Sequence, residues 1–148
     1  MNIEVYCDGG CRGNGKENSV GGWGVFMSYN GFEKEIYGGE LNTTNNKMEL
    51  TGVIKALEAI KTTNIPIKVY CDSRYVVENY SKSVNNWIKK GWRKSDNQPV
   101  KNVELWKKLV ELINKQADLE FIWVKGHSIN EGNNKADELA NKGMDELS

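Results

Sequence analysis

Four acidic side chains, spread along the 148-residue chain, have the types and settings to do chemistry together: Asp8, Glu49, Asp72 and Asp137. Clustered carboxylates repel one another and raise each other's pKa, so a fold that gathers them needs a cation. Oxygen ligands alone suit Mg²⁺, for which Mn²⁺ can substitute, rather than zinc. Two such ions about 4 Å apart can hold the attacking water and the leaving oxygen of a phosphodiester. The four acids therefore predict a centre for phosphodiester hydrolysis with two Mg²⁺ ions.

Each acid also has a structural interpretation, and the residue types alone leave both open. The Asp-Gly dipeptide that begins at Asp8 is a strong turn signal. Glu49 follows Asn46 by three residues, as in a helix capping box. Asp72 could cap a following helix, and Asp137 could be a favourable charge in the first turn of the last helix.

The elements that must position these acids alternate strands with helices. Asn30-Gly31 is a hairpin turn and makes the second and third strands antiparallel. The crossover through the first helix makes the fourth strand parallel to the first, so the strand ends at Asp8 and Asp72 meet at one sheet edge. Open α/β sheets bind ligands at that edge. The predicted strands are 3–7, 22–29, 32–37, 65–71 and 119–124, and the predicted helices are 46–61, 73–80, 82–90, 103–113 and 133–143.

Glycines punctuate the first and third predicted strands. Gly9 and Gly10 predict that the first strand stops at Asp8 and a glycine-rich loop follows over 9–20, where the backbone could approach a phosphate. Gly38-Gly39 predicts the end of the third strand.

His127 is the only histidine of the chain and follows the last predicted strand. A lone histidine is more often structural than catalytic, but this one belongs to a loop at the sheet edge that carries Asp8. An unperturbed imidazole titrates near pH 6.5, so it could take or give a proton there.

Residues 82–108 differ in composition from the rest of the chain. They hold eight basic side chains against only Asp96 and Glu104, with Trp87, Trp92 and Trp106 interleaved. Basic residues among aromatic ones indicate a nucleic-acid surface. The alternative is a solvated helical face whose tryptophans pack inward.

Length and composition limit the number of domains, the partners and the compartment. The length predicts one domain over 1–148, and Lys plus Arg equal Asp plus Glu at 20 each, so global charge names no partner. No apolar run approaches the roughly 20 residues of a membrane span. An odd number of cysteines (Cys7, Cys11 and Cys71) indicates free thiols in a reducing compartment, and we expect a cytoplasmic monomer with no obligatory protein partner.

Six motifs in order along nearly the whole chain resemble the type 1 ribonucleases H, in their bacterial form with a basic protrusion. They are Asp8-Gly-Gly-Cys-Arg-Gly-Asn14, Thr43-Thr-Asn-Asn-Lys-Met-Glu-Leu50, Asp72-Ser73, Gly91-Trp92 with Pro99-Val-Lys-Asn-Val-Glu-Leu-Trp106, Val124-Lys-Gly-His127, and Ala136-Asp-Glu-Leu-Ala140.

The resemblance implies an α/β fold of the ribonuclease H type: a five-stranded mixed sheet, three antiparallel strands and then parallel ones, with helices on both faces. It implies endonucleolytic cleavage of the RNA strand of RNA–DNA hybrids, leaving 5′-phosphate and 3′-hydroxyl ends. The metal ligands would be Asp8, Glu49, Asp72 and Asp137, with His127 assisting proton transfer or product release.

The resemblance also implies contacts to the hybrid. Cys11, Asn14 and Asn45 would lie near the RNA 2′-hydroxyls, Asn46 would contact the hybrid, and Thr44 would hold a DNA phosphate. The protrusion, about 82–101, would bind substrate through Trp87, Lys89, Lys90, Trp92, Arg93 and Lys94.

Two departures from the family pattern affect substrate binding. Ser83 stands where bacterial members often have an aromatic residue, and the loop 14–21 is longer than usual and lacks prolines. Two other classes of function use related folds: a binding module without catalysis, and a DNA-processing enzyme such as an integrase. The intact acids with His127 argue against the first, and the Thr-Thr-Asn-Asn segment with the basic stretch argues against the second.

Overall fold

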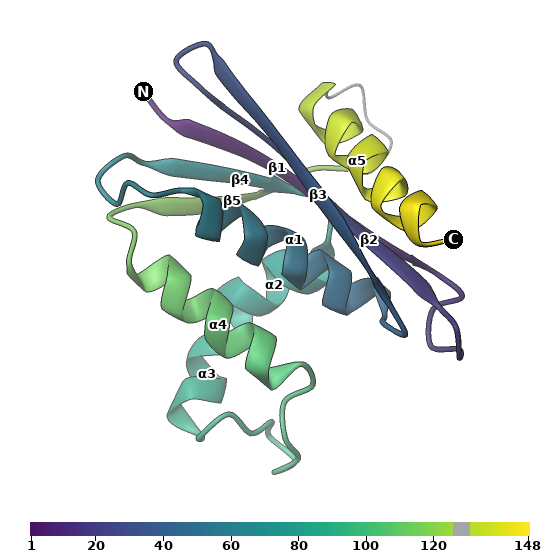
Figure 1. The fold of residues 1–148 in the computed structure, drawn as a ribbon. Helices are drawn as coiled ribbons and strands as arrows, with labels where there is room; N and C mark the ends of the chain where they lie inside the picture. The colour runs from purple at the N-terminus through teal and green to yellow at the C-terminus, as the bar shows by residue number, and fades with distance from the viewer. Residues whose placement is uncertain (126–130) are drawn as a thin grey trace.

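A mixed five-stranded sheet organises the computed structural model, which describes residues 1–125 and 131–148 (Figure 1). The strand order is β3-β2-β1-β4-β5, with β1, β2 and β3 antiparallel to their neighbours and β1, β4 and β5 parallel. This is the mixed sheet predicted from the sequence. The strands are β1 (Ile3–Arg12), β2 (Val20–Tyr29), β3 (Phe32–Leu41), β4 (Ile67–Cys71) and β5 (Leu119–Trp123).

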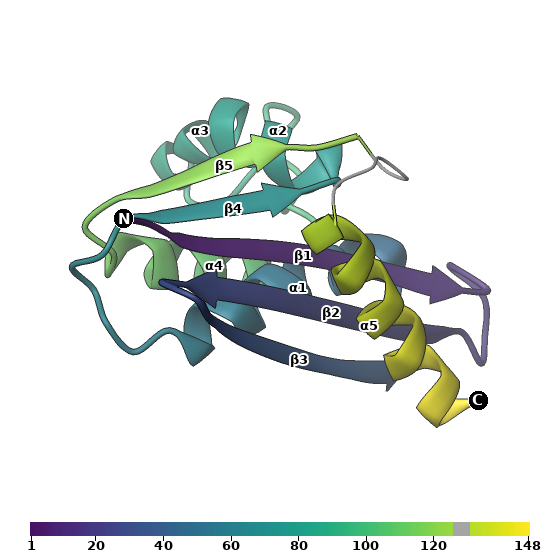
Figure 2. The ribbon, with the colours of Figure 1, turned by 90° about the horizontal axis from the view of Figure 1, so that it is seen from above.

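Helices cover both faces of the sheet, as predicted. Helix α5 lies on one face, and the other described helices gather on the opposite side (Figures 1 and 2). The helices are α1 (Asn45–Ala59), α2 (Arg74–Lys82), α3 (Val84–Lys89), α4 (Val103–Asn114) and α5 (Glu131–Leu147). No helix in the described part of the chain is long and apolar enough to cross a membrane.

The core lies between the sheet and helices α1 and α4. Val5 and Cys7 of β1 alternate with half-buried residues and point into it, as β-strand periodicity requires. Leu50 and Leu57 of α1 and Trp106 of α4 are almost fully buried against them. This core fixes β1 and the start of α1, which carry two of the four acids.

The glycines after Asp8 do not begin a loop, so that prediction is wrong. Strand β1 continues to Arg12, and Gly9 and Gly10 pair with Trp23 and Gly22 of β2. A Cβ on Gly9 would lie 2.4 Å from the backbone carbon of Met48, so the glycine is required by the close approach of α1. The turn interpretation of Asp8 fails for the same reason.

The third strand also continues past its glycines, contrary to prediction. Gly38 pairs with Trp23 inside β3, and a Cβ there would lie 2.7 Å from the Trp23 ring. A Cβ on Gly39 would lie 2.6 Å from the carbonyl oxygen of Gly143 in α5. These glycines therefore let a ring and a helix pack directly on the strand.

The structural interpretations of the other acids are wrong as well. Thr44, not Asn46, caps α1, and its side chain accepts a hydrogen bond from the Lys47 N–H at 3.2 Å. Ser73, not Asp72, caps α2. Helix α5 begins at Glu131, which places Asp137 in its second turn rather than its first. None of these three acids is needed to start its helix.

Candidate active site

Asp8 and Asp72 lie side by side because of the register of two parallel strands. Cys7 of β1 is paired with Cys71 of β4, and the next residue of each strand is the acid. Strand β4 ends there, so Asp72 leaves the sheet beside Asp8. The indole N–H of Trp123 donates to the Asp72 carbonyl oxygen at 3.2 Å and ties this point to β5. The sheet-edge prediction for these two acids is confirmed.

Glu49 reaches the same point from the start of the second turn of α1. Gly9 permits the helix backbone to touch β1, and Gly52, one turn later, would place a Cβ 3.2 Å from the Asp8 carbonyl oxygen. With this close packing, Asp8, Glu49 and Asp72 each offer a carboxylate oxygen within 4.8 Å of the other two. The three acids therefore form one cluster of oxygen ligands.

Asp137 comes to this cluster from α5, on the other face of the sheet. Gly24 lets α5 approach β2, since a Cβ there would lie 2.3 Å from the Ala136 carbonyl oxygen. The Asp137 side chain is hydrogen-bonded to the Asp8 carboxyl group and raises the pKa of Asp8. All four predicted acids are thus brought together, although Asp137 is not within the tightest group of three.

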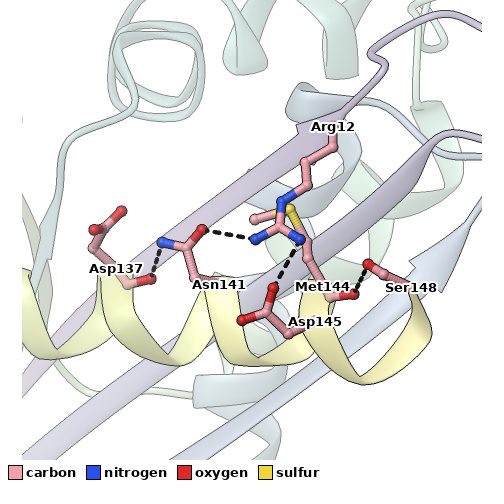
Figure 3. A network of polar contacts seen from close by, with 6 residues as sticks. All are labelled: Arg12, Asp137, Asn141, Met144, Asp145 and Ser148. Atoms are coloured by element: carbon pink, nitrogen blue, oxygen red, sulfur yellow. Dashed lines mark hydrogen bonds and ion pairs between the residues drawn. The ribbon is translucent and has the colours of Figure 1, made fainter.

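Polar contacts tie the end of β1 to α5 next to Asp137 (Figure 3). The Asn141 amide donates to the Asp137 carbonyl oxygen at 3.0 Å, and the Arg12 guanidinium donates to the Asn141 side-chain oxygen at 3.4 Å. Arg12 also forms an ion pair with Asp145 at 2.8 Å. Strand β1 and helix α5 are therefore linked by side chains as well as by packing.

Burial raises the pKa of two of the acids, Asp8 and Glu49. It raises the pKa of Asp8 to about 9, with further increases from Asp72 and from the hydrogen bond to Asp137, and a partial opposing effect of the Gly9 N–H. Burial and then the charges of Asp8 and Asp72 raise the pKa of Glu49 well above its ordinary value. A divalent cation would remove the penalty of ionising both groups.

One buried oxygen fits a metal ligand in particular. Among the described residues, Oε2 of Glu49 is buried and has no hydrogen-bond partner. A buried polar atom left unpaired costs about 1–3 kcal/mol, which a bound cation would offset. The oxygen faces a cavity of about 220 Å³ that the four acids share with Asn133, Asn134 and Asn141. The donor set and the space both fit Mg²⁺.

The sequence analysis did not single out the asparagines of this cavity. Asn133 and Asn141 stand four residues before and after Asp137, on one stripe of α5. That spacing was readable in the sequence. The predicted helix began only at 133, so Asn133 stood at its very end, whereas α5 already begins at Glu131.

The residues expected near the RNA strand form a second group beside the start of α1. The side-chain oxygen of Asn14 accepts from the Asn45 N–H at 2.9 Å, and the Cys11 thiol donates to the Thr43 carbonyl oxygen at 3.4 Å. Asn14 and Asn45 are exposed, as is Asn46. Thr44 keeps its hydroxyl hydrogen free for a ligand while its oxygen caps α1.

The basic stretch divides into exposed charges and inward-facing rings. Its tryptophans follow the structural alternative: Trp87 and Trp92 are half-buried against the core, and Trp87 meets Trp106 edge-on at 5.5 Å. The basic side chains are exposed, and several line a groove of about 360 Å³. Within the basic stretch, the exposed residues predicted to bind substrate are Lys89, Lys90, Arg93 and Lys94.

His127, predicted to assist catalysis, lies outside the described residues.

A family model described as RNase H matches residues 1–145. The chain belongs to the ribonuclease H family. It is 51% identical over 145 residues to Ribonuclease H of Methylobacillus flagellatus, covering 98% of this chain and 93% of that protein. It is 47% identical over 146 residues to Ribonuclease H of Ruthia magnifica, covering 99% and 97%. These matches confirm the resemblance drawn from the six motifs.

Solved structures of this family have the same fold. The crystal structure of LC9-RNase H1, a type 1 RNase H with the type 2 active-site motif, matches with a TM-score of 0.87 and 33% identity, over 99% of this chain and 73% of that one. LC11-RNase H1 in complex with an RNA/DNA hybrid matches with a TM-score of 0.74 and 27% identity, over 99% of this chain and 100% of that one.

Proposed function

We propose that this ribonuclease H cuts the RNA strand of RNA–DNA hybrids at the cluster of Asp8, Glu49, Asp72 and Asp137. The observation that carries the proposal is the convergence of three carboxylates within 4.8 Å of one another in a chain of this family. LC11-RNase H1 was solved with an RNA/DNA hybrid, and its fold matches nearly the whole chain. The expected products carry 5′-phosphate and 3′-hydroxyl ends.

The four acids would hold two Mg²⁺ ions, and Mn²⁺ would substitute. When bound, the ions would polarise the scissile phosphate and lower the pKa of a water. Asp8 is central to this arrangement, because its carboxyl group neighbours both Asp72 and Asp137. Glu49 supports the assignment through its buried and unpaired Oε2. Asp8 would therefore serve both ions, with the other acids on either side.

The group formed by Cys11, Asn14 and Asn45 would recognise RNA beside the acids. Only the 2′-hydroxyl distinguishes RNA from DNA at a given nucleotide, and it both donates and accepts hydrogen bonds. The exposed side-chain amides of Asn14 and Asn45 offer both functions, and the Asn45 backbone N–H, which donates to Asn14 Oδ1 at 2.9 Å, holds the two residues together. Asn46 and Thr44 would contact the hybrid next to them, Thr44 through a DNA phosphate.

The exposed basic side chains of the protrusion would contact phosphates away from the acids: Lys89, Lys90, Arg93 and Lys94. Trp87 and Trp92 would act by holding these side chains in place, since both rings pack against the core. His127 would assist proton transfer or product release, since an unperturbed imidazole titrates near pH 6.5. We expect a monomer in the cytoplasm.

A cleavage gel with matched substrates tests the proposal. RNA–DNA hybrid, duplex RNA and duplex DNA of one sequence are incubated with the protein, with Mg²⁺ or with EDTA. We expect cutting only of the RNA strand of the hybrid, and only in the samples that contain Mg²⁺. Asp118→Asn, at an exposed acid far along the sheet from the cluster, is the control and should cut normally. Cutting of duplex DNA, or of hybrid in EDTA, would contradict the proposal.

A further inference from the structure

Part of the sheet face that carries α5 has no helix over it. Helix α5 packs on β1, β2 and β3. In Figure 2 it crosses those strands, while β4 and β5 lie outside its path. Among the described residues, the outer face near the beginnings of β1, β4 and β5 is therefore open. This face is on the opposite side of the sheet from the basic stretch.

The strand register arranges the side chains of this face in two parallel rows. One row runs from β3 to β5 as Glu33, Ser28, Glu4, Lys68 and Glu120. The adjacent row runs as Glu35, Phe26, Tyr6, Tyr70 and Ile122. We call the two rows together the acidic–aromatic face.

The acids of the first row form no ion pair in the part of the chain that the structure describes. Glu4, Glu33 and Glu120 form no ion pair with any residue that the structure describes. Glu4 is instead held by the Tyr6 hydroxyl, which donates to its Oε2 at 3.2 Å. Tyr6 in turn stacks on Tyr70 with ring centroids 4.7 Å apart. Tyr6 therefore orients the Glu4 carboxylate, and the exposed Glu33 and Glu120 carry further negative charge along the row.

One end of the aromatic row already binds a cation from the protein itself. The Lys135 ammonium lies 4.6 Å from the Phe26 ring centroid and 3.7 Å from a Glu35 carboxylate oxygen. Phe26 is buried there, and Tyr6, whose ring lies against Gly132 of α5, continues along a groove of about 380 Å³ that Glu4, Glu33 and Glu131 also line. A cation over a ring with a carboxylate beside it is a favourable arrangement. The groove offers a further ring and further carboxylates to a second cation.

We propose that the acidic–aromatic face docks an extended segment of a partner protein with a basic residue at every third position. Phosphates would be repelled by the acids, so nucleic acid does not fit. A single metal ion does not fit either, because the only acids in the described chain close enough to share an ion are those of the active site. A row of separated carboxylates along aromatic rings suits a row of cationic side chains.

The spacing of the acids specifies the segment. Glu33, Glu4 and Glu120 belong to alternate strands, and strands lie about 4.8 Å apart, so the acids recur about every 9.6 Å. A polyproline II segment places every third side chain on one side, about 9.3 Å apart. Such segments dock in aromatic-lined grooves. An Arg-x-x-Arg-x-x-Arg segment therefore matches the face.

Lys68 is the one residue of the row whose charge would repel a basic segment, so replacing it gives an effect opposite in sign to replacing an acid. It stands between Glu4 and Glu120 and forms no ion pair with any described residue. Removing it should strengthen binding of a basic segment, whereas removing an acid should weaken binding. General loss of folding cannot produce these opposite changes.

The experiment titrates isotope-labelled protein with a proline-rich peptide that has arginine at every third position, and follows amide signals by NMR. Mg²⁺ is kept saturating so that the active-site acids are occupied. We expect saturable shifts at Glu4, Tyr6 and Tyr70. A peptide of the same composition with its arginines adjacent should bind several-fold more weakly.

Variants then assign the binding to this face. Glu33→Gln and Glu120→Gln should each weaken binding about two- to fivefold, and Lys68→Gln should tighten it by a similar factor, the range of exposed ion pairs. Glu111→Gln and Glu146→Gln, at exposed acids elsewhere, should bind as the parent does. Hybrid cleavage should be unchanged in all five, which separates this inference from the proposed function.

Several results would overturn the inference. They are shifts confined to the active-site acids, equal binding of the two peptides, or weaker binding after Lys68→Gln. Self-association that Glu33→Gln or Glu120→Gln abolishes would also overturn it, since the basic stretch of a second copy would then be the occupant.

Discussion

The acid cluster and the basic stretch are built in opposite ways. Asp8 is buried, Glu49 and Asp72 are half-buried, and all three are positioned by strand register and by glycines that let a helix touch a strand. Lys89 and Arg93 project into solvent from a short helix and a turn, and only the neighbouring rings are anchored in the core. The acids of the cluster are therefore held by the packed strands and helix, whereas the basic side chains are surrounded by solvent.

The difference indicates a division of labour between chemistry and binding. Metal ligands must be held to fractions of an ångström, which buried side chains on rigid elements achieve. Phosphate contacts act over longer distances and tolerate movement, since they depend mainly on charge. We therefore expect changes in the cluster to alter turnover and changes in the basic stretch to alter affinity.

The largest effect should come from Asp8→Asn. It removes the charge that neighbours both Asp72 and Asp137, and metal ions supply several kcal/mol of transition-state stabilisation. Turnover should fall at least about 10³-fold, since each 1.4 kcal/mol is a factor of ten. Hybrid affinity should be retained, because the basic stretch is untouched. Single-turnover rates and a binding titration on the same preparation measure both, and near-normal turnover in the folded variant would remove Asp8 from the centre.

His127→Ala should have a smaller effect on turnover. The histidine is expected to move a proton next to the acids, and positioned acid–base groups contribute roughly 10²-fold. We expect kcat to fall by about that factor with little change in KM, since the residue adds little ground-state binding. Steady-state kinetics at saturating Mg²⁺ measure both constants. Wild-type kinetics would instead assign His127 a structural role and leave proton transfer to water.

Replacing Lys89, Lys90, Arg93 and Lys94 by alanine should invert this pattern. Hybrid affinity should fall while turnover at saturating substrate stays near normal. Each lost phosphate contact should flatten the slope of log K against log salt by up to about 0.9. The matched control replaces four lysines elsewhere on the surface: Lys34, Lys61, Lys115 and Lys142. An unchanged slope in the first variant would mean that the basic stretch is only a solvated face.

The smallest effect concerns stability without metal. The pKa of Asp8 is raised to about 9 in the folded protein against 3.8 for the ordinary group, so the folded state keeps a proton that the unfolded state releases. The free energy of unfolding should therefore be highest below pH 4 and fall as the pH rises toward 9. Saturating Mg²⁺ or Asp8→Asn should reduce this fall.

Urea denaturation across that pH range, with EDTA or with Mg²⁺, measures the prediction. A free energy of unfolding that rises with pH in EDTA, or that has the same pH dependence with and without Mg²⁺, would contradict the assignment of a raised pKa to the cluster.

Some of this site could be predicted from strand periodicity and topology. The crossover connection already placed Asp8 beside Asp72, and the register confirms it. The position of Glu49 could not be derived in this way, because it depends on Gly9 being pressed against Met48. Local rules assigned that glycine to a turn, since a sequence does not show which backbone will pack against it.

The same limit applies to the helix ends and the tryptophans. Thr44 and Asn46 are both acceptable caps by residue type, and the hydrogen bond to Lys47 decides between them. The interleaved rings were compatible with either binding or packing, and Trp87 of α3 packs on the buried Trp106 of α4. Asp137 was grouped with the other acids by residue type alone, and its role as a metal ligand came from the family resemblance, since nothing local indicates which face α5 covers.

Anomalous diffraction from a crystal soaked in Mn²⁺ tests the central claim most directly. We expect anomalous density at coordination distance from the carboxylates of Asp8, Glu49 and Asp72. We expect this density to be lost in Asp8→Asn crystals treated in the same way. Density only at other sites, in a protein that still cuts the RNA strand of a hybrid, would contradict it.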